Sequence, residues 1–399
     1  MNKFDYLILL IILVGALGLL YSPLYPSRVL AIIISPYVIR LIRKKEIHIP
    51  KYIKNFFLVW IFTAIISLLW SYSRIDGVKA LFYNYCNIIL FFSIYVFAHK
   101  ARKPFTSIYL GWIIWFLITS LFALYEFSTG NHLDNAVQDE TAKITSLDGI
   151  TVQRMFASVT YGNLNNYNVI VCYCVMFIMS AIAYFYNKIQ LALWGLLLLA
   201  VYIVMMNASR GAFLCLILSI CIFLPYILKK NGNRLLMILL LIASVSFIIL
   251  NSEMFLGQIF GRLSTSNIAD DNTRINIWKN ALKALEETLG LGVGMGGDTI
   301  ALLKINPREI SATHNMFLEF LLQFGIVPFI FFLKMIYCII KKCIVSKDLY
   351  LKLLGLLMCV TLIPINIINS KYLLMTFFWM FWGSAFTLSQ NKIIQNVVR

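Results

Sequence analysis

The chain has 399 residues, of which 61% are hydrophobic and only 13% are charged, and its formal net charge is +17. A typical soluble domain carries about 25% charged residues, so this composition leaves too little polar surface to coat a water-soluble globule. The apolar residues also fall in blocks of about 17–22, the length that a helix needs to cross a bilayer. Backbone groups in lipid must be paired within such a block. We therefore predict an all-α polytopic membrane protein and exclude a soluble fold.

Apolar length and flanking charge predict about twelve transmembrane helices. The expected spans, in chain order, are residues 5–22, 28–42, 56–71, 78–98, 106–126, 166–186, 189–206, 211–228, 235–251, 315–340, 350–369 and 372–389. The chain has no evident linker, low-complexity run or internal repeat, which predicts a single integral domain over 1–399.

Basic residues are concentrated in every second segment between the predicted spans. The dense clusters are Arg43/Lys44/Lys45, Lys100/Arg102/Lys103, Lys229/Lys230/Arg234 and Lys341/Lys342/Lys347. Cytoplasmic loops carry such an excess of Lys and Arg, so both termini are expected in the cytoplasm. Residues 127–165 and 252–314 then form the two long outer loops. The same placement explains the net charge without a nucleic-acid partner.

The larger outer loop is predicted to be partly helical. Its segment NTRINIWKNALKALEETL has apolar residues at helical spacing, namely Ile275, Trp278, Leu282 and Leu285. Asp271 or Asn272 can serve as the N-cap, and the glycine-rich GLGVGMGG that follows ends the pattern. We expect an amphipathic helix near 272–289 that lies on the outer membrane interface.

Two arginines are candidate phosphate-binding residues. Arg210, in NASRGAF, lies at the outer boundary of two predicted spans, where a charge is costly unless it is paired or used. Its planar fork suits bidentate phosphate recognition, although a snorkelling anchor is an open alternative. Arg274 opens the predicted outer helix, at the end where the macrodipole disfavours a cation. An ordinary exposed loop arginine is the alternative for Arg274.

His314 is a candidate general base, at the start of the predicted span 315–340 in SATHNMFLEFLLQFGI. With Thr313 or Asn315 as the cap, the positive helix end should favour the neutral imidazole, which can accept a proton. A solvated loop histidine is the alternative. Glu319 follows in the next turn, and a carboxylate inside a span is a functional candidate that could orient His314 or pair with an arginine.

Four strings in this order resemble the O-antigen ligase/polymerase (Wzy-type) membrane family. They are RMFASVTYGNLNNYN beginning at Arg154, NASRGAF around Arg210, DDNTRINIWKNAL around Arg274 and SATHNMFLEFLLQFGI around His314. The resemblance covers roughly residues 150–330, and the earlier spans match only in hydropathy.

The resemblance implies a GT-C-like fold and an inverting glycosyltransferase that needs no metal, cofactor or nucleotide sugar. The implied donor is an oligosaccharide on undecaprenyl diphosphate, at the outer face of a bacterial inner (cytoplasmic) membrane. Arg210 and Arg274 would bind the lipid-linked diphosphate, and His314 would deprotonate the acceptor hydroxyl. Arg154, Glu319 and Asn315 are expected as supporting residues.

The string H-N-x-F-L-E-x-L-x-x-x-G-I at His314 favours a polysaccharide (O-antigen or capsule) polymerase that joins lipid-linked repeat units. Val327 and Pro328 stand where the polymerase pattern usually has a second glycine. A ligase that transfers the glycan to lipid A core is one alternative. A flippase or other transporter is another, although it should carry charges along a central path within the spans. Expected partners are the lipid-linked oligosaccharide and membrane lipid, with a chain-length regulator and a flippase as candidate protein partners.

Overall fold

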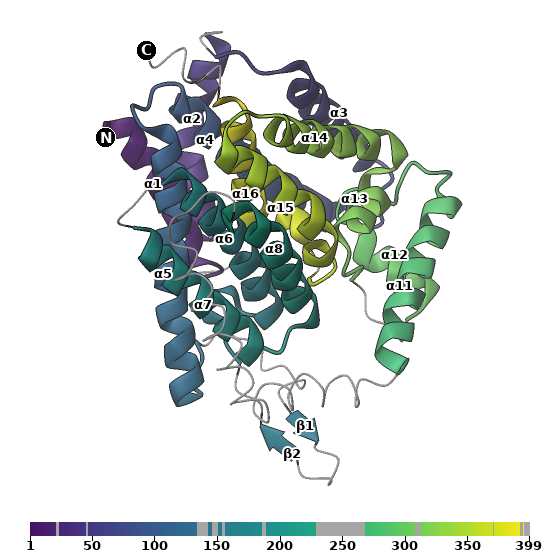
Figure 1. Ribbon diagram of the computed structural model, residues 1–399. Helices are drawn as coiled ribbons and strands as arrows, with labels where there is room; N and C mark the ends of the chain where they lie inside the picture. The colour runs from purple at the N-terminus through teal and green to yellow at the C-terminus, as the bar shows by residue number, and fades with distance from the viewer. Residues whose placement is uncertain are drawn as a thin grey trace.

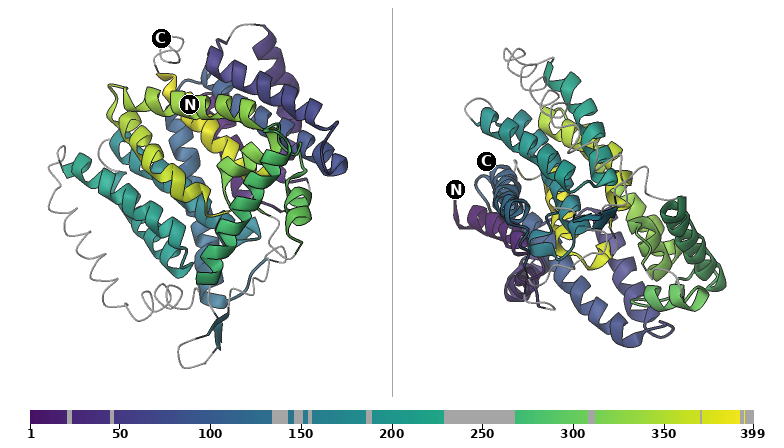
Figure 2. Two further views of the ribbon diagram at one scale, coloured as in Figure 1. Left: turned by 90° about the vertical axis from the view of Figure 1, so that its right-hand side faces the viewer. Right: turned by 90° about the horizontal axis from the view of Figure 1, so that it is seen from below.

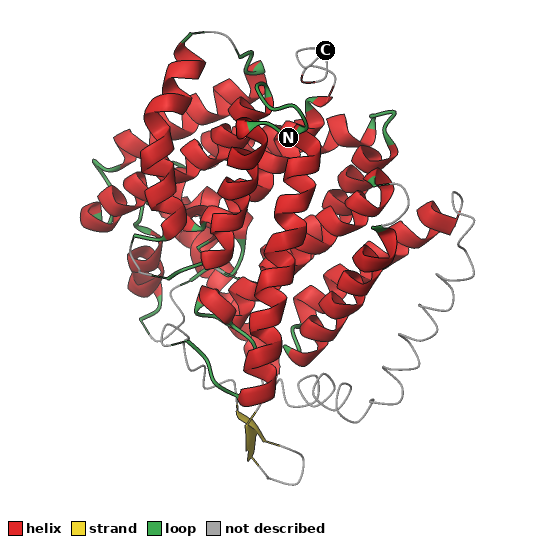
Figure 3. Cartoon of the chain, turned by 90° about the vertical axis from the view of Figure 1, so that its left-hand side faces the viewer, coloured by secondary structure: helices red, strands yellow, loops and turns green. Residues whose placement is uncertain are grey.

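The computed structural model is a helical bundle (Figure 1). It describes residues 1–20, 24–44, 47–133, 143–145, 151–153, 156–185, 189–228, 268–307, 312–369, 371–391 and 394. Figure 3 shows that the described chain is helical apart from one small hairpin of two strands, which projects from the bundle.

The first third of the chain forms five helices and one short 3-10 helix. Their starts carry the expected signals: Asn2 makes a capping box, Ser73 caps α4, and Pro26 and Pro104 occupy first-turn positions. The elements are α1 (Lys3–Val14), η1 (Gly15–Leu17), α2 (Pro26–Arg43), α3 (Lys51–Ser67), α4 (Arg74–Ala98) and α5 (Pro104–Thr129).

The rest of the described chain begins with the hairpin, in which β1 and β2 pair antiparallel, and continues as helices. The elements are β1 (Lys143–Thr145), β2 (Thr151–Gln153), η3 (Val159–Tyr161), α6 (Leu164–Tyr184), α7 (Gln190–Met206), α8 (Arg210–Leu228), α11 (Ile268–Glu287), α12 (Asp298–Ile305), α13 (Met316–Phe324), α14 (Ile326–Ile344), α15 (Leu349–Asn366), η4 (Tyr372–Leu374) and α16 (Thr376–Ser389).

Four of the described helices are long and apolar enough to cross a membrane, namely α4, α5, α6 and α15. Two shorter apolar helices, Gln190–Met206 and Arg210–Pro225, add to them. The protein is therefore a helical membrane protein, as its composition predicts. The predicted span 235–251 lies outside the described residues.

The predicted span 315–340 is not one continuous helix. Gly325 separates α13 from α14 with a φ of 79°, a conformation that glycine adopts without strain. A Cβ at Gly325 would clash with the carbonyl oxygen of Gly290, which also accepts a hydrogen bond from Ile326 N at 3.0 Å. At 9 residues, α13 is too short to cross a bilayer core of about 30 Å. The expectation of a single span here is wrong because this turn packs against a distant segment.

Aromatic packing joins the helices that support the candidate site. Trp60 of α3 and Trp379 of α16 stack with their ring centroids 4.7 Å apart, and Phe320 of α13 lies 6.0 Å from Trp60. All three side chains are buried. Seen from below, α15 and α16 lie in the middle of the molecule, between α6–α8 on one side and α11–α13 on the other (Figure 2, right).

The packed face of α11 differs from the predicted one. Ile277, Ala281 and Ala284 are buried, whereas Ile275 and Leu282 are about half exposed. The buried residues are shifted from the predicted stripe because α11 packs on α12 and α13. Ile275 and Leu282 of the predicted stripe therefore face outward, whereas Trp278 packs against the buried cluster.

Candidate functional site

The candidate site is centred on the loop between α15 and η4 (residues 367–369 and Lys371), here called the α15–η4 loop. Arg274 reaches this loop from α11, where its Nη1 donates to Ile367 O at 3.2 Å. Within the described part of the chain, this is the one hydrogen bond that the Arg274 side chain makes. A guanidinium has five N–H donors. The half-buried Arg274 therefore keeps donors for a ligand.

His314 lies beside Arg274 because the segment before α13 is joined to α11. Trp278, one helical turn after Arg274, donates from Nε1 to Thr313 O at 2.9 Å. Asn315 caps α13, and its Oδ1 accepts from the backbone N–H groups of the second and third helical positions, 317 and 318. Between these two fixed points, the backbone of His314 has a φ of 46°.

The imidazole of His314 is held in its neutral form. Burial lowers the pKa of His314 to about 4, and the positive charge of Arg274 acts in the same direction. The Nδ1 atom is buried and has no hydrogen-bond partner among the described residues. A neutral ring with a nitrogen not engaged by the protein can accept a proton from a bound hydroxyl group.

Arg210 begins α8, and the start of this helix adjoins the same loop. A Cβ added at Gly211 would lie 2.7 Å from Ile368 Cγ1 and 3.4 Å from Pro364 O, so the backbone of α8 passes close to the end of α15. The side chain of Arg210 is exposed. The structure thus brings the segments of Arg210, Arg274 and His314 together at one loop.

Glu319 supports this site through the backbone. Its carboxylate is buried, and it accepts from Tyr372 N at 3.0 Å and from Leu373 N at 3.3 Å. Within the described part of the chain, the hydrogen-bond partners of Glu319 are thus neither His314 nor an arginine. Glu319 fixes the start of η4 relative to α13.

Three more side chains hold η4, and sequence reasoning did not single them out. Asn87 and Trp379 donate to Leu373 O at 3.0 and 2.9 Å, and Arg28 donates to Leu374 O at 3.2 Å. With Glu319, they form a set that we call the η4 anchors, contributed by α2, α4, α13 and α16. The sequence offers one signal for Arg28, because it is a charged residue at the start of a predicted span, where a charge marks a candidate functional residue.

Arg154 lies outside the described residues, but the end of its string reaches the site. Asn369 in the α15–η4 loop donates from Nδ2 to Asn166 Oδ1, and Asn166 donates to Tyr161 O at 3.0 Å. These asparagines connect the start of α6 to the loop.

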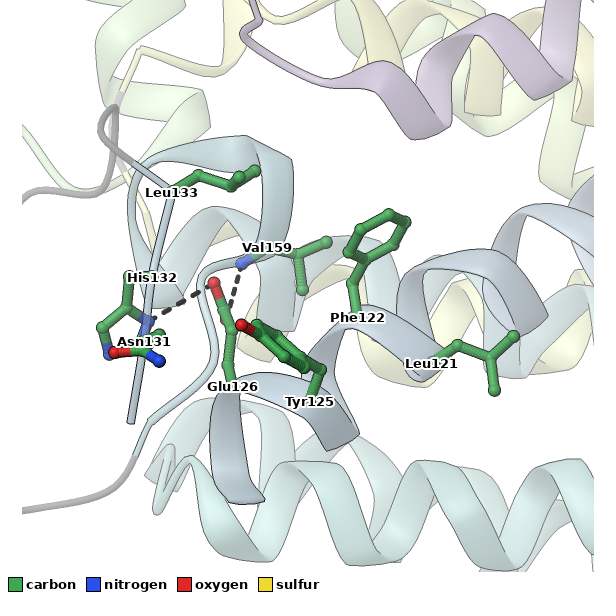
Figure 4. Close-up of a pocket in the computed structure, with 8 residues that line it drawn as sticks. All are labelled: Leu121, Phe122, Tyr125, Glu126, Asn131, His132, Leu133 and Val159. Atoms are coloured by element: carbon green, nitrogen blue, oxygen red, sulfur yellow. Dashed lines mark hydrogen bonds and ion pairs between the residues drawn. The ribbon is translucent and has the colours of Figure 1, made fainter. Parts of the chain in front are cut away.

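A separate cavity of about 550 Å³ lies at the end of α5 (Figure 4). The carboxylate of Glu126 accepts from Ser158 N at 2.7 Å and Val159 N at 2.9 Å, and its other oxygen lies 3.3 Å from His132 Nδ1. The lining residues are Leu121, Phe122, Tyr125, Glu126, Asn131, His132, Leu133 and Val159. Glu126 therefore fixes the segment before α6, and Asn166 in the first turn of α6 reaches the α15–η4 loop.

The fold and the site together define a helical membrane protein with two arginine-bearing segments and a neutral histidine at one loop. Residues 194–333, which include all three segments, match the family model described as O-antigen ligase. The teichuronic acid biosynthesis protein TuaE of Bacillus subtilis (strain 168) is 22% identical over 291 residues, which cover 68% of this chain and 56% of that relative. The match thus spans little more than half the relative's length. The resemblance to the O-antigen ligase/polymerase family is confirmed by these findings, whereas neither of them supports a flippase.

Proposed function

We propose that this protein is a polysaccharide polymerase that joins undecaprenyl-diphosphate-linked oligosaccharide units at the outer face of a bacterial cytoplasmic membrane. The observation that carries the proposal is the meeting of Arg274, His314 and the start of α8 at the α15–η4 loop. Cations and a proton acceptor in one place are what transfer from a diphosphate requires.

In this proposal, the arginines act on the donor. Arg274 and Arg210 bind the diphosphate oxygens with charge-assisted hydrogen bonds. These bonds strengthen as the bond between the anomeric carbon and the diphosphate oxygen breaks, because negative charge then grows on the leaving group. The arginines thereby supply the charge stabilisation for which other transferases use a metal ion.

His314 acts on the acceptor. Its neutral ring takes the proton of the acceptor hydroxyl while that oxygen forms the new bond to the anomeric carbon. Attack from the face opposite the diphosphate inverts the anomeric configuration, and undecaprenyl diphosphate leaves. The low pKa of His314 favours the return of the proton to solvent before the next cycle.

One resemblance favours a polymerase over a ligase: the H-N-x-F-L-E-x-L-x-x-x-G-I string around His314 resembles that of polysaccharide polymerases. The Bacillus relative is named for teichuronic acid biosynthesis, which is consistent with a role in polysaccharide biosynthesis. A GT-C architecture of about twelve spans with both termini in the cytoplasm is part of this proposal, since it places the α15–η4 loop at the outer face.

Genetic complementation tests the proposal. In a host that lacks the gene, the wild-type chain should restore a full surface-glycan ladder on a gel, whereas His314→Ala, Arg274→Ala and Arg210→Ala should leave single repeat units. Lys283→Ala, an exposed position on α11, is the matched control and should behave as the wild type. Free polymer that lacks its anchor in the deletion strain would identify a ligase. Unchanged polymer with all three variants would contradict the transferase assignment.

A further inference from the structure

Lys371 has a backbone conformation that its residue type disfavours. Its φ is 59° and its ψ is 34°, in the left-handed region. Residues other than Gly, Asn and Asp rarely adopt this region, because their Cβ atom crowds the carbonyl oxygen. Glycine would fit this position without strain, yet the chain places an exposed lysine here.

The surroundings hold Lys371 in this conformation. The η4 anchors bind two of the three backbone N–H groups and two carbonyl groups of the three residues that follow Lys371. The preceding part of the loop is bound by Arg274 at Ile367 and by Asn166 at Asn369. A strained residue that is fixed from both sides is typical of functional sites.

The ammonium group of Lys371 has no hydrogen bond or ion pair with any residue that the structure describes. Its positive charge interacts with three carboxyl groups, the exposed one of Asp76 and the buried ones of Asp298 and Glu319. Burial raises the pKa of Asp298, and the positive charge of Lys371 opposes this rise. Lys371 therefore presents an exposed cation, with no hydrogen bond to a described residue, on the same loop that Arg274 contacts.

We propose that Lys371 is a third cation for the donor, and that its ammonium binds a non-bridging oxygen of the lipid-linked diphosphate beside Arg274. Lysine binds phosphate as a point charge, which complements the planar fork of an arginine. The inference rests on the proposed function. It adds Lys371 to the donor site of that function, although Lys371 lies outside residues 194–333, which match the family model. The competing role is structural, as a counter-charge for Asp298.

Substitution by glycine separates the two roles. Lys371→Gly removes both the ammonium and the backbone strain, so the purified full-length protein should melt at the wild-type temperature or above it. We expect this variant to bind undecaprenyl diphosphate about 10-fold more weakly in nanodiscs. The donor KM should rise by a similar factor while kcat changes little. Lys371→Arg should recover most of the loss, and Lys283→Ala should show none.

Four outcomes decide between the two roles. Inorganic pyrophosphate should compete with the lipid for the wild type and less well for Lys371→Gly, which places the contact at the diphosphate rather than at the lipid chain. Wild-type binding by Lys371→Gly, while His314→Ala and Arg274→Ala lose activity, would overturn this inference and leave the proposed function intact. Full activity of His314→Ala and Arg274→Ala would overturn the proposed function itself. A lower melting temperature for Lys371→Gly with unchanged binding would assign Lys371 the structural role.

Discussion

At the scale of single residues, His314 combines a positive φ, a buried ring nitrogen and a neighbouring guanidinium. The burial of the ring and the positive charge of Arg274 both disfavour the imidazolium, and they lower the pKa of His314 to about 4. The positive φ is a backbone feature and does not act on this pKa. In the proposed mechanism, the ring is therefore neutral and able to accept a proton at neutral pH.

The low pKa of His314 predicts the acid limb of the activity profile. An imidazole with a lowered pKa is neutral and competent above that pKa, so activity should fall only as the pH drops through about 4. Arg274→Gln removes a positive charge and should move this limb upward, toward the ordinary value of about 6.5. The measurement is the pH dependence of kcat with saturating donor. A limb near pH 6.5 that does not respond to Arg274→Gln would show that His314 is not the base.

Glu319 should be important for stability because of its two backbone partners. Glu319→Ala leaves the N–H groups of Tyr372 and Leu373 buried without an acceptor, which costs about 1–3 kcal/mol for each group. Glu319→Gln keeps one acceptor oxygen and should lose less. Thermal unfolding in detergent measures the effect, and Glu286→Ala, on the exposed face of α11, is the control. Equal melting of Glu319→Ala and the wild type would refute this role.

At the scale of elements, the turn between α13 and α14 decides where His314 and Glu319 lie. The close approach of Gly325 and Gly290 lets α13 turn away from the direction of α14. Without this turn, residues 316–344 would form one long helix, and the site residues at its start would move away from α11.

Gly325→Ala should therefore affect both folding and activity. With a φ of 79° and a ψ of −175°, Gly325 lies in a region that essentially only glycine adopts, so a residue with a Cβ there costs about 1–3 kcal/mol. The clash with Gly290 adds to this cost. We expect a lower melting temperature and a loss of polymer in complementation. Gly195→Ala is the matched control, because a Cβ there meets nothing within 4 Å and alanine favours the helix by about 0.5–1 kcal/mol. If the two variants behave alike, the turn is not required.

The sequence predicts apolar helices well and their interruptions poorly. The helices α4, α5, α6 and α15 follow from apolar length alone, because lipid imposes that length on a span. The turn at Gly325 could not be predicted, since the hydropathy of residues 315–340 is continuous and the partner segment is distant in sequence. Arg274 and His314 were recognisable as charged or titratable groups next to spans. Asn87, Trp379 and Lys371 were not, because their roles depend on the direction of the η4 backbone.

At the scale of the whole molecule, the family match covers residues 194–333, whereas the η4 anchors Arg28, Asn87 and Trp379 lie outside it. The candidate site thus depends on helices from both ends of the chain. The start of α1 and the end of α16 lie toward one end of the bundle, and the β1–β2 hairpin lies at the other (Figure 1). This arrangement fits the orientation in which the basic clusters face the cytoplasm.

Cysteine labelling tests that orientation. Lys283 of α11 and Lys347 before α15 are both exposed, and the proposal places them on opposite sides of the membrane. In intact cells, a membrane-impermeant maleimide should label Lys283→Cys and leave Lys347→Cys unlabelled until the membrane is opened. The unmodified chain, with its eight native cysteines, gives the background. The reverse pattern would place the site in the cytoplasm.

The anchoring of η4 also has a consequence for hydrogen exchange. The amide hydrogens of Tyr372 and Leu373 point at a carboxylate on α13, while the carbonyl groups of the same turn are bound from α2, α4 and α16. Release of these amides therefore requires α13 to separate from a turn that three other helices hold in place. Their deuterium uptake should follow the cooperative opening of the entire bundle rather than local fraying.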